Sequence, residues 1–310
     1  MNDPEVLVIG RNCLDYISIV EKFPEEDKKT ALCFRMVEGG GQGGTSSCCI
    51  ARLGGKVTLL GRLGDDEEGR FIVERLRAFE VDTDHMEKVK GGKTPVAYLF
   101  VTRATGKRTI VYEPNRLPKI TADNRLADLA SRAGSILLDP DVTYLGRELR
   151  RIIKNKVKII YDCERWRDGV GDMMALADFF IPSSDFLDSM ELNLKSGSLS
   201  GKIMELGQRV RGTLIVTHGE DGAYYLSGKM LFHVAAPEVK AVDTTGAGDN
   251  FHGAFALALS RGYDLHEAVT FAVAVASLSC RGYGGRSGLP TMAEAGETAE
   301  KLTAVTVGIP

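Results

Sequence analysis

The sequence predicts an α/β fold with three layers, in which helices cover both faces of a mainly parallel central sheet and a small β-lid is added. Short apolar strands alternate with helical patterns along almost the whole chain, as expected for βαβ units. Two segments, 13–37 and 94–113, break this alternation, because each carries short alternating stretches with no helix between them. We expect a single domain, 1–310, in which these two segments form the lid.

The expected elements follow from local hydrophobic pattern. Buried strands are expected at the short apolar runs 6–9, 57–60, 136–138, 157–161, 179–181 and 214–216. Helices are expected near 43–53, 66–79, 123–132, 144–154, 172–178, 201–211, 247–260 and 265–280. In the second lid segment, Ala104-Thr-Gly106 is typical of a hairpin turn, and a further hairpin is expected at 223–234.

Composition excludes several classes of function. The chain is 44% hydrophobic, and its 39 basic and 42 acidic residues are interspersed with a formal net charge of −3, so no nucleic-acid-binding surface is expected. No apolar run approaches the ~18 residues of a membrane helix, and the acidic start argues against a signal peptide. Six cysteines show neither disulfide nor zinc spacing, so we expect reduced thiols, no structural metal and a cytoplasmic location.

The most informative stretch is Thr244-Thr-Gly-Ala-Gly-Asp249, directly before an amphipathic helix pattern. A glycine turn at a helix start leaves N–H groups unpaired at the positive end of the helix dipole, where phosphate binds well. We expect Gly246 to form the turn and the N–H groups of Ala247, Gly248 and Asp249 to form an anion hole. The adjacent carboxylate of Asp249 fits a base that takes the proton from a hydroxyl attacking a phosphoryl group.

Three local expectations follow. The anion hole should lower the pKa of Asp249 and keep this group ionised at neutral pH. Gly253, one turn later, should leave room above the carboxylate. His252 shares its helix face and could hydrogen-bond to it, although a structural histidine is the commoner case. An N-capped core helix is the simpler alternative for the whole stretch, but a cap needs one residue only.

The segment Asp243-Thr-Thr-Gly-Ala-Gly-Asp249 resembles the second signature of the ribokinase-like (PfkB-type) carbohydrate kinases. Their first signature is matched by Gly39-Gly-Gly-Gln-Gly-Gly44, with Leu53-Gly54 and Gly61-Arg-Leu-Gly-Asp65 behind it. The resemblance runs from residue 6 to about residue 290. It implies a ribokinase-like fold, an ATP-dependent sugar kinase, Mg²⁺ as a cofactor with a monovalent cation left open, and a homodimer that forms through the lid.

For the nucleotide, the resemblance implies contacts from Thr217, Gly219 and Gly222, which follow an expected strand, and from Thr244, Gly246 and Gly248 at the helix start. Glycines at a strand end do let phosphates approach the backbone. A tight turn into the hairpin 223–234 explains Gly219 and Gly222 equally well.

For the sugar, Asp15 lies just past the first strand, where open α/β sheets bind ligands, and its carboxylate can accept hydrogen bonds from two hydroxyls. Gly40 and Gly41 would let a polyol approach the backbone, and Gln42 and Thr45 add donors and acceptors. Arg108, in the second lid segment, could reach the transferring phosphate, or could be a solvated charge on an edge strand.

The substrate is a ketose by resemblance to the ketohexokinase (fructokinase) branch and the related sulfofructose kinases. A sugar acid, a sulfosugar or a nucleoside is the alternative. The chain departs from the family pattern at Cys13, at Gln42 and Thr45, and at Ser183-Ser-Asp-Phe186, which replaces the usual Asn-x-x-Glu metal motif. An anionic sugar would need a cation in or near the lid segments, where Lys29, Arg35, Arg103 and Arg116 are available, although ordinary solubility is the commoner reason for each of them.

Three other classes compete. Gly39-x-Gly41-x-x-Gly44 formally matches the dinucleotide fingerprint of an NAD-dependent oxidoreductase, with Asp65 and Asp66 about 20 residues on, but it does not follow the first strand directly. Gly92-Lys-Thr94 resembles the end of a P-loop, but Pro95 and a strand pattern follow it instead of a helix. The third class is a sensor that binds a sugar or nucleotide without turnover.

Overall fold

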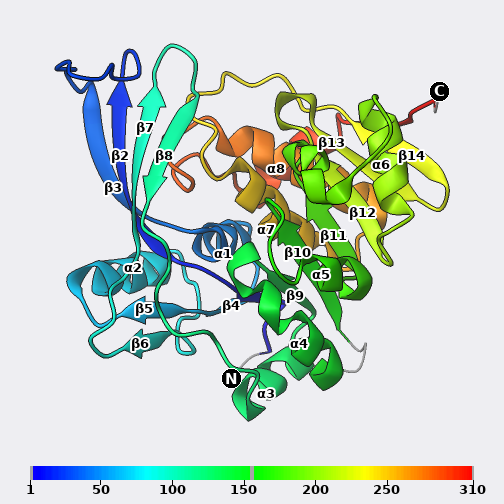
Figure 1. Cartoon of the computed structure of the whole chain (residues 1–310), viewed down its shortest axis with the longest axis horizontal. Coiled ribbons are helices and arrows are strands. Elements are labelled where there is room, and N and C mark those ends of the chain that lie inside the picture. Colours follow the sequence, from blue (N-terminus) through cyan, green and yellow to red (C-terminus); the bar gives the residue numbers. More distant parts are fainter. Residues whose placement is uncertain (1–2, 154–156, 309–310) are drawn as a thin grey trace.

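A computed structural model describes residues 3–153 and 157–308. Within those residues the central sheet has nine strands in the order β15-β14-β13-β12-β11-β10-β9-β1-β4 (Figure 1). The parallel strands are β4 (Val57–Leu60), β1 (Val6–Ile9), β9 (Ser135–Leu138), β10 (Lys158–Cys163), β11 (Phe179–Pro182) and β12 (Thr213–Thr217). The antiparallel strands β13 (Ala223–Ser227), β14 (Met230–Val234) and β15 (Ala304–Thr306) extend one edge.

Helices cover both faces of this sheet because neighbouring residues of each strand point to opposite faces. In β1, Val6 and Val8 join one buried core while Leu7 and Ile9 join the other. The first core is covered by α1 (Gln42–Arg52), α2 (Glu67–Ala78), α7 (Ala247–Ser260), α8 (Leu265–Ser279) and α9 (Met292–Ala299). The second is covered by α3 (Asn124–Arg132), α4 (Gly146–Ile153), α5 (Val170–Leu176) and α6 (Leu199–Gly207).

The lid is a separate four-stranded sheet in the order β3-β2-β7-β8, which stands to one side of the central sheet (Figure 1). Its strands are β2 (Cys13–Val20), β3 (Phe34–Gly40), β7 (Val96–Thr102) and β8 (Arg108–Tyr112). A short parallel pair, β5 (Arg62–Gly64) and β6 (Glu87–Val89), lies below it. Several large apolar side chains of the lid are exposed: Phe23, Leu32, Phe34, Val37, Tyr98, Ile110, Val111 and Tyr112.

The predicted three-layer fold is confirmed. All six expected buried strands, all eight expected helices and both hairpins are present, with bounds shifted by a few residues. Residue 154, the last of one expected helix, lies outside the described residues. The strands that were not expected are β5, β6 and β15, which have three residues each. The α-helix that was not expected is α9, which lies beyond residue 290, where the resemblance ends. No helix in the described ranges is long and apolar enough to span a membrane.

Two further features bear on the site. Five of the six cysteines are buried and unpaired, whereas Cys33, in the lid, is exposed and unpaired. Helices α1 and α7 pack unusually closely at Gly253. A Cβ atom added at this glycine would lie 2.7 Å from the backbone oxygen of Ser46, which is too close for a side chain. The expectation that Gly253 leaves room above Asp249 was therefore wrong, since α1 occupies the space beside this glycine.

Replacing Gly253 with alanine is expected to destabilise the protein by ~1–3 kcal/mol, because the added methyl group meets backbone that can move only if α1 moves. Gly296→Ala is the matched control. It also lies within a helix, α9, but no atom lies within 4 Å of its added Cβ, so a gain of ~0.5–1 kcal/mol is expected. Chemical denaturation of both variants measures the difference, and equal stabilities would contradict the packing argument.

Candidate active site

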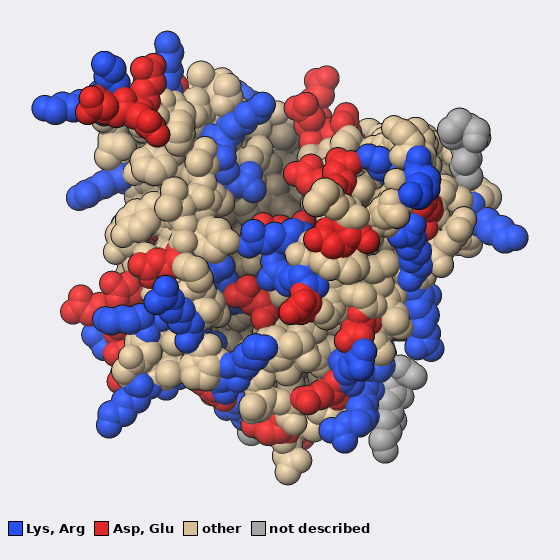
Figure 2. Space-filling view, in the orientation of Figure 1, with Lys and Arg blue, Asp and Glu red and all other residues tan. Residues whose placement is uncertain are grey.

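A cavity of about 570 Å³ lies between the lid and the carboxyl ends of the parallel strands. Figure 2 shows its opening as a hollow with acidic and basic side chains at the floor and rim. Segments that are distant in the sequence line it, and they include the start of α1, strand β8, the end of β10 and the start of α7. It therefore receives the residues of both glycine-rich motifs.

The start of α7 forms one end of the cavity. Gly246 adopts a left-handed conformation with φ of 73°, which suits glycine, and turns the chain into the helix. The N–H of Ala247 donates to the carbonyl oxygen of Thr244 at 3.3 Å. In the described structure the N–H groups of Gly248 and Asp249 have no such backbone acceptor. Two N–H groups at this helix start, rather than the expected three, are thus free to receive an anion.

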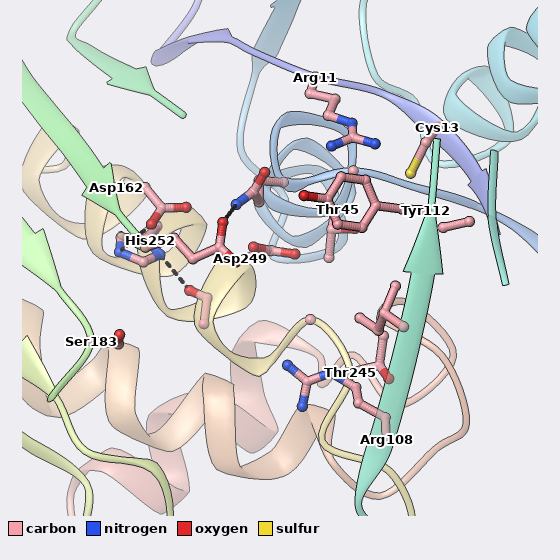
Figure 3. A pocket seen from close by; sticks show the side chains of 18 of the residues that line it. Arg11, Cys13, Thr45, Arg108, Tyr112, Asp162, Ser183, Thr245, Asp249 and His252 are labelled. Carbon is pink, nitrogen blue, oxygen red and sulfur yellow. Dashed lines mark hydrogen bonds and ion pairs between the residues drawn. The ribbon is translucent and has the colours of Figure 1, made fainter. Parts of the chain in front are cut away.

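Arg108 brings positive charge to the same end. Its Nη1 atom donates to Thr244 Oγ1 at 3.0 Å, across the gap between strand β8 and the start of α7 (Figure 3). Arg108 is nevertheless exposed on the edge strand β8, so a contact with the transferring phosphate stays a prediction beside the alternative of a solvated charge.

Asp249 carries a proton more readily than the sequence suggested. Burial raises the pKa of its carboxyl to about 8, and Asp162 adds to the rise, while His252 and Arg108 oppose it. The expected lowering by the helix start was wrong for the protein without ligands, because removal of a carboxylate from water outweighs the nearby dipole and cation. A group with this pKa is poised to exchange a proton near neutral pH.

His252 contacts backbone carbonyl oxygens rather than the carboxylate of Asp249. Its Nδ1 atom lies 2.6 Å from the carbonyl oxygen of Gly248, and its Nε2 atom lies 3.2 Å from that of Ile181. Nε2 is also 3.6 Å from a carboxylate oxygen of Asp162 (Figure 3). The hydrogen bond to Asp249 considered above was therefore wrong, and His252 holds α7 against β11.

Asp15 lies at the other end of the cavity, on β2. Burial raises its pKa to about 6, an effect that the Cys13 thiol, Arg286 and Arg11 reduce. The thiol donates to Asp15 Oδ1 at 3.1 Å. A Cβ atom at Gly40 would lie 2.0 Å from Asp15 Oδ2, so this glycine makes space for the carboxylate itself.

Arg286 explains more of the first glycine run. It is only 2% exposed, and its Nη2 atom donates to the carbonyl oxygen of Gly40 at 3.3 Å. A Cβ atom at Gly39 or Gly44 would lie within 2.7 Å of its guanidinium nitrogens. The run is therefore glycine-rich in part because a buried arginine and Asp15 lie directly against it.

The cavity brings together these predicted residues: Asp15, Gly41, Gln42, Thr45, Arg108, Thr217, Gly246, Gly248 and Asp249. Five others do not line it: Gly40, Thr244, Ala247, Gly219 and Gly222. Gly222, with φ of 96°, turns the chain tightly between β12 and β13, since its Cβ would lie 2.1 Å from Val234 O. The tight-turn alternative therefore describes its geometry, and a nucleotide contact stays a prediction.

The alternative motifs are resolved by position. The formal dinucleotide fingerprint follows β3 of the lid rather than β1, and Asp66 caps α2 by accepting from Gly69 N at 3.0 Å. Thr94 donates its hydroxyl to Asp66 and precedes strand β7, so it forms no P-loop.

The cavity fits a Mg²⁺ ion that arrives on a nucleotide. The side chains of Asp162, Glu164 and Asp185 line it, and burial raises the pKa of Asp162 to about 8, a cost that a cation would relieve. The described residues contain no group of three or more side chains that could hold a metal by themselves. Mg²⁺ usually keeps water and phosphate oxygens as ligands, so these carboxylates suit contacts through water.

The cavity residues that sequence reasoning missed include Arg11, Tyr112, Asp162, Glu164 and Arg165. Asp162, Arg165 and Arg11 directly follow or end buried strands, and that position alone could have nominated them. Nothing in the sequence pattern around Tyr112 indicated a site residue.

The pfkB family carbohydrate kinases match residues 3–292, and the chain belongs to that family. It is an ATP-dependent sugar kinase. Ketohexokinase from Mus musculus is 27% identical over 90% of this chain and 97% of the relative, and ribokinase from Bacillus subtilis is 28% identical over 94% and 98%. The solved structure of Arabidopsis thaliana ribokinase complexed with ribose and ATP has a TM-score of 0.82 at 22% identity, covering 96% of this chain and 99% of that one.

Asp249→Asn is expected to stabilise the protein increasingly as pH rises from 5 to 8. Over this range the unfolded chain has already released the proton of Asp249, because the ordinary pKa of this group is 3.8, whereas the folded chain retains it up to a pKa of about 8. Rising pH therefore destabilises the folded wild type through this group, and the amide removes the effect. Thermal unfolding at each pH measures it. Asp185→Asn, an exposed carboxylate of the same cavity, is the control, and a pH-independent gain would contradict the argument.

Proposed function

We propose that this kinase transfers the γ-phosphoryl group of ATP to a primary hydroxyl of a small sugar of the ketose type, with Asp249 as the base. The observation that carries the proposal is the position of Asp249. This desolvated carboxyl lines one cavity together with the free N–H groups of the α7 start and with Asp15. The 27% identity to ketohexokinase supports the ketose.

The chemistry follows from these positions. Asp15 accepts hydrogen bonds from sugar hydroxyls, and Gln42 and Thr45 at the start of α1 add further contacts. The sugar is thereby held with its reacting hydroxyl toward Asp249. Holding both reactants in one orientation supplies a large part of the rate in phosphoryl transfer.

Asp249 then takes the proton of the attacking hydroxyl. The ionised form of Asp249, which predominates above its pKa of about 8, is a stronger base than an exposed aspartate, and the loss of negative charge on protonation suits its desolvated position. The N–H groups of Gly248 and Asp249, together with Arg108, stabilise the charge of the transferring phosphoryl group. Mg²⁺ bound to the phosphates would add positive charge there, held through water by Asp162, Glu164 and Asp185.

The lid completes the site by excluding water. Its strand β8 contributes Arg108 and Tyr112 to the cavity wall, so the wall depends on the lid position. ATP as cosubstrate and the unpaired thiols support a cytoplasmic location.

The test is sugar-dependent ADP release from ATP·Mg, measured over a panel of ketoses, aldoses and nucleosides. Turnover is expected with at least one ketose, and Asp249→Asn should lower kcat by ~10²–10⁴ while ATP affinity changes by only a few-fold. Sugar binding without ADP release would identify a sensor instead. An unchanged kcat in Asp249→Asn would remove Asp249 as the base.

We also propose that the protein is a homodimer joined through the lid. Five of the exposed apolar side chains of the lid lie on its edge strands β3 and β8, and a second copy is the commonest partner for such edges. Light scattering at micromolar concentration is expected to give twice the mass of the chain. Val111→Lys places a charge on the 59% exposed residue of β8 and should favour the monomer. A wild-type monomer at that concentration would disprove the dimer.

A further inference from the structure

Two arginines that the mechanism above does not use line the cavity. Arg11 follows β1 and Arg165 follows β10, and both contact Tyr112 at the end of lid strand β8. Arg165 Nη2 donates to Tyr112 Oη at 2.8 Å, and the Arg11 guanidinium lies 5.3 Å from the centre of the Tyr112 ring. In Figure 3, Arg11 and Arg108 lie at opposite ends of the cavity. Arg11 is therefore separate from the phosphate-binding end.

The carboxylates near these two arginines are paired largely with a third arginine, Arg167. Asp141 lies 3.9 Å from Arg11 Nε and 3.5 Å from Arg167, and Glu164 lies 3.6 Å from Arg167. Glu164 also accepts from Gln42 at 3.5 Å. Among the described ion pairs, none includes Arg165.

Arg11 also has an unused donor. Its Nε atom is buried and lacks a hydrogen-bond acceptor within the described residues. This atom is buried against Asp141 rather than open to the cavity, so a ligand contact falls to the outer nitrogens of the guanidinium, one of which donates to the carbonyl oxygen of Glu113 at 3.2 Å. Guanidinium groups bind oxyanions with particular strength, because they offer several N–H groups in one plane.

We propose that Arg11 and Arg165 form a subsite for a terminal oxyanion of the sugar, namely a carboxylate, sulfonate or phosphate group. The inference rests on the proposed kinase function and narrows its substrate to an anionic sugar. The neutral-ketose expectation came from Gln42 and Thr45, which line the same cavity and remain free to bind hydroxyls.

The lid cations expected from sequence do not fill this role. Lys29, Arg35, Arg103 and Arg116 are exposed and do not line the cavity. Arg103 instead pairs with Glu21 at 3.0 Å. The cations placed to meet an anionic sugar come from the strand ends of the central sheet.

The experiment compares kcat/KM for fructose with that for 6-deoxy-6-sulfofructose, fructose 6-phosphate and 2-keto-3-deoxygluconate. At least one anionic sugar is expected to exceed fructose by ~10-fold or more. In Arg11→Gln and in Arg165→Gln, the ratio of anionic to neutral kcat/KM should fall at least ~10-fold. Arg116→Gln, an exposed lid arginine outside the cavity, is the matched control and should keep the wild-type ratio.

For variants or sugars that give no turnover, sugar binding is measured instead. Thermal shift is recorded with the same sugars while a non-hydrolysable ATP analogue and Mg²⁺ fill the nucleotide site. Stabilisation by an anionic sugar that is lost in Arg11→Gln supports the subsite, provided that the variant alone melts cooperatively within a few degrees of wild type.

Two outcomes overturn the subsite, and a third separates it from the proposed function. A preference for fructose that both variants retain would show that no anionic group binds there. A rise in the KM for ATP of equal size with every sugar would assign the two arginines to a phosphate of ATP. If no sugar is turned over but anionic sugars still bind through Arg11, the proposed function fails while the subsite stands.

Discussion

The close contact between α1 and α7 is the constraint on which the site depends. Gly253 brings α7 against the backbone of Ser46, and the Ser46 hydroxyl donates to the carbonyl oxygen of Asp249 at 2.9 Å. One helix begins at the first glycine run and the other at the second. A side chain between them would separate the two glycine turns, and with them the sugar end and the phosphate end of the cavity. Arg286 connects the segment after α8 to the first glycine run, because its side chain donates a hydrogen bond to the carbonyl oxygen of Gly40 in β3.

Like charges lie together at and behind the cavity wall. Asp139 and Asp162 are buried and Asp249 is half-buried, and their pKa values are all raised, to about 7, 8 and 8. In each, loss of solvation is the largest cause, and the neighbouring carboxyls add to it. Such an arrangement lowers the stability of the folded chain but creates groups that bind protons or cations near neutral pH. The fold tolerates it because two large hydrophobic cores flank the sheet on either side.

Local pattern predicted most of the architecture. The buried strands, the helices and both glycine turns depend on residues adjacent in the sequence, so their positions could be predicted. The short strands β5, β6 and β15 could not, since three residues carry no periodicity. The predictions that failed at the site concern properties that are set by residues distant in the sequence. Burial by surrounding elements reversed the expected pKa shift of Asp249, and α1 filled the space expected above it at Gly253. Arg11 and Arg165 reach one tyrosine from separate strand ends, which only the folded sheet brings together.

The distribution of thiols has a practical consequence for studying motion. Cys33, between β2 and β3, is exposed, while the other five cysteines are buried in the core or at the cavity wall. A maleimide fluorophore would therefore attach at a single position on the wild-type lid, without prior removal of other cysteines. The emission of that probe could then follow lid closure in real time as sugar and nucleotide are added. The same exposure makes Cys33 the first thiol to oxidise on storage, so a reducing agent should be present until labelling.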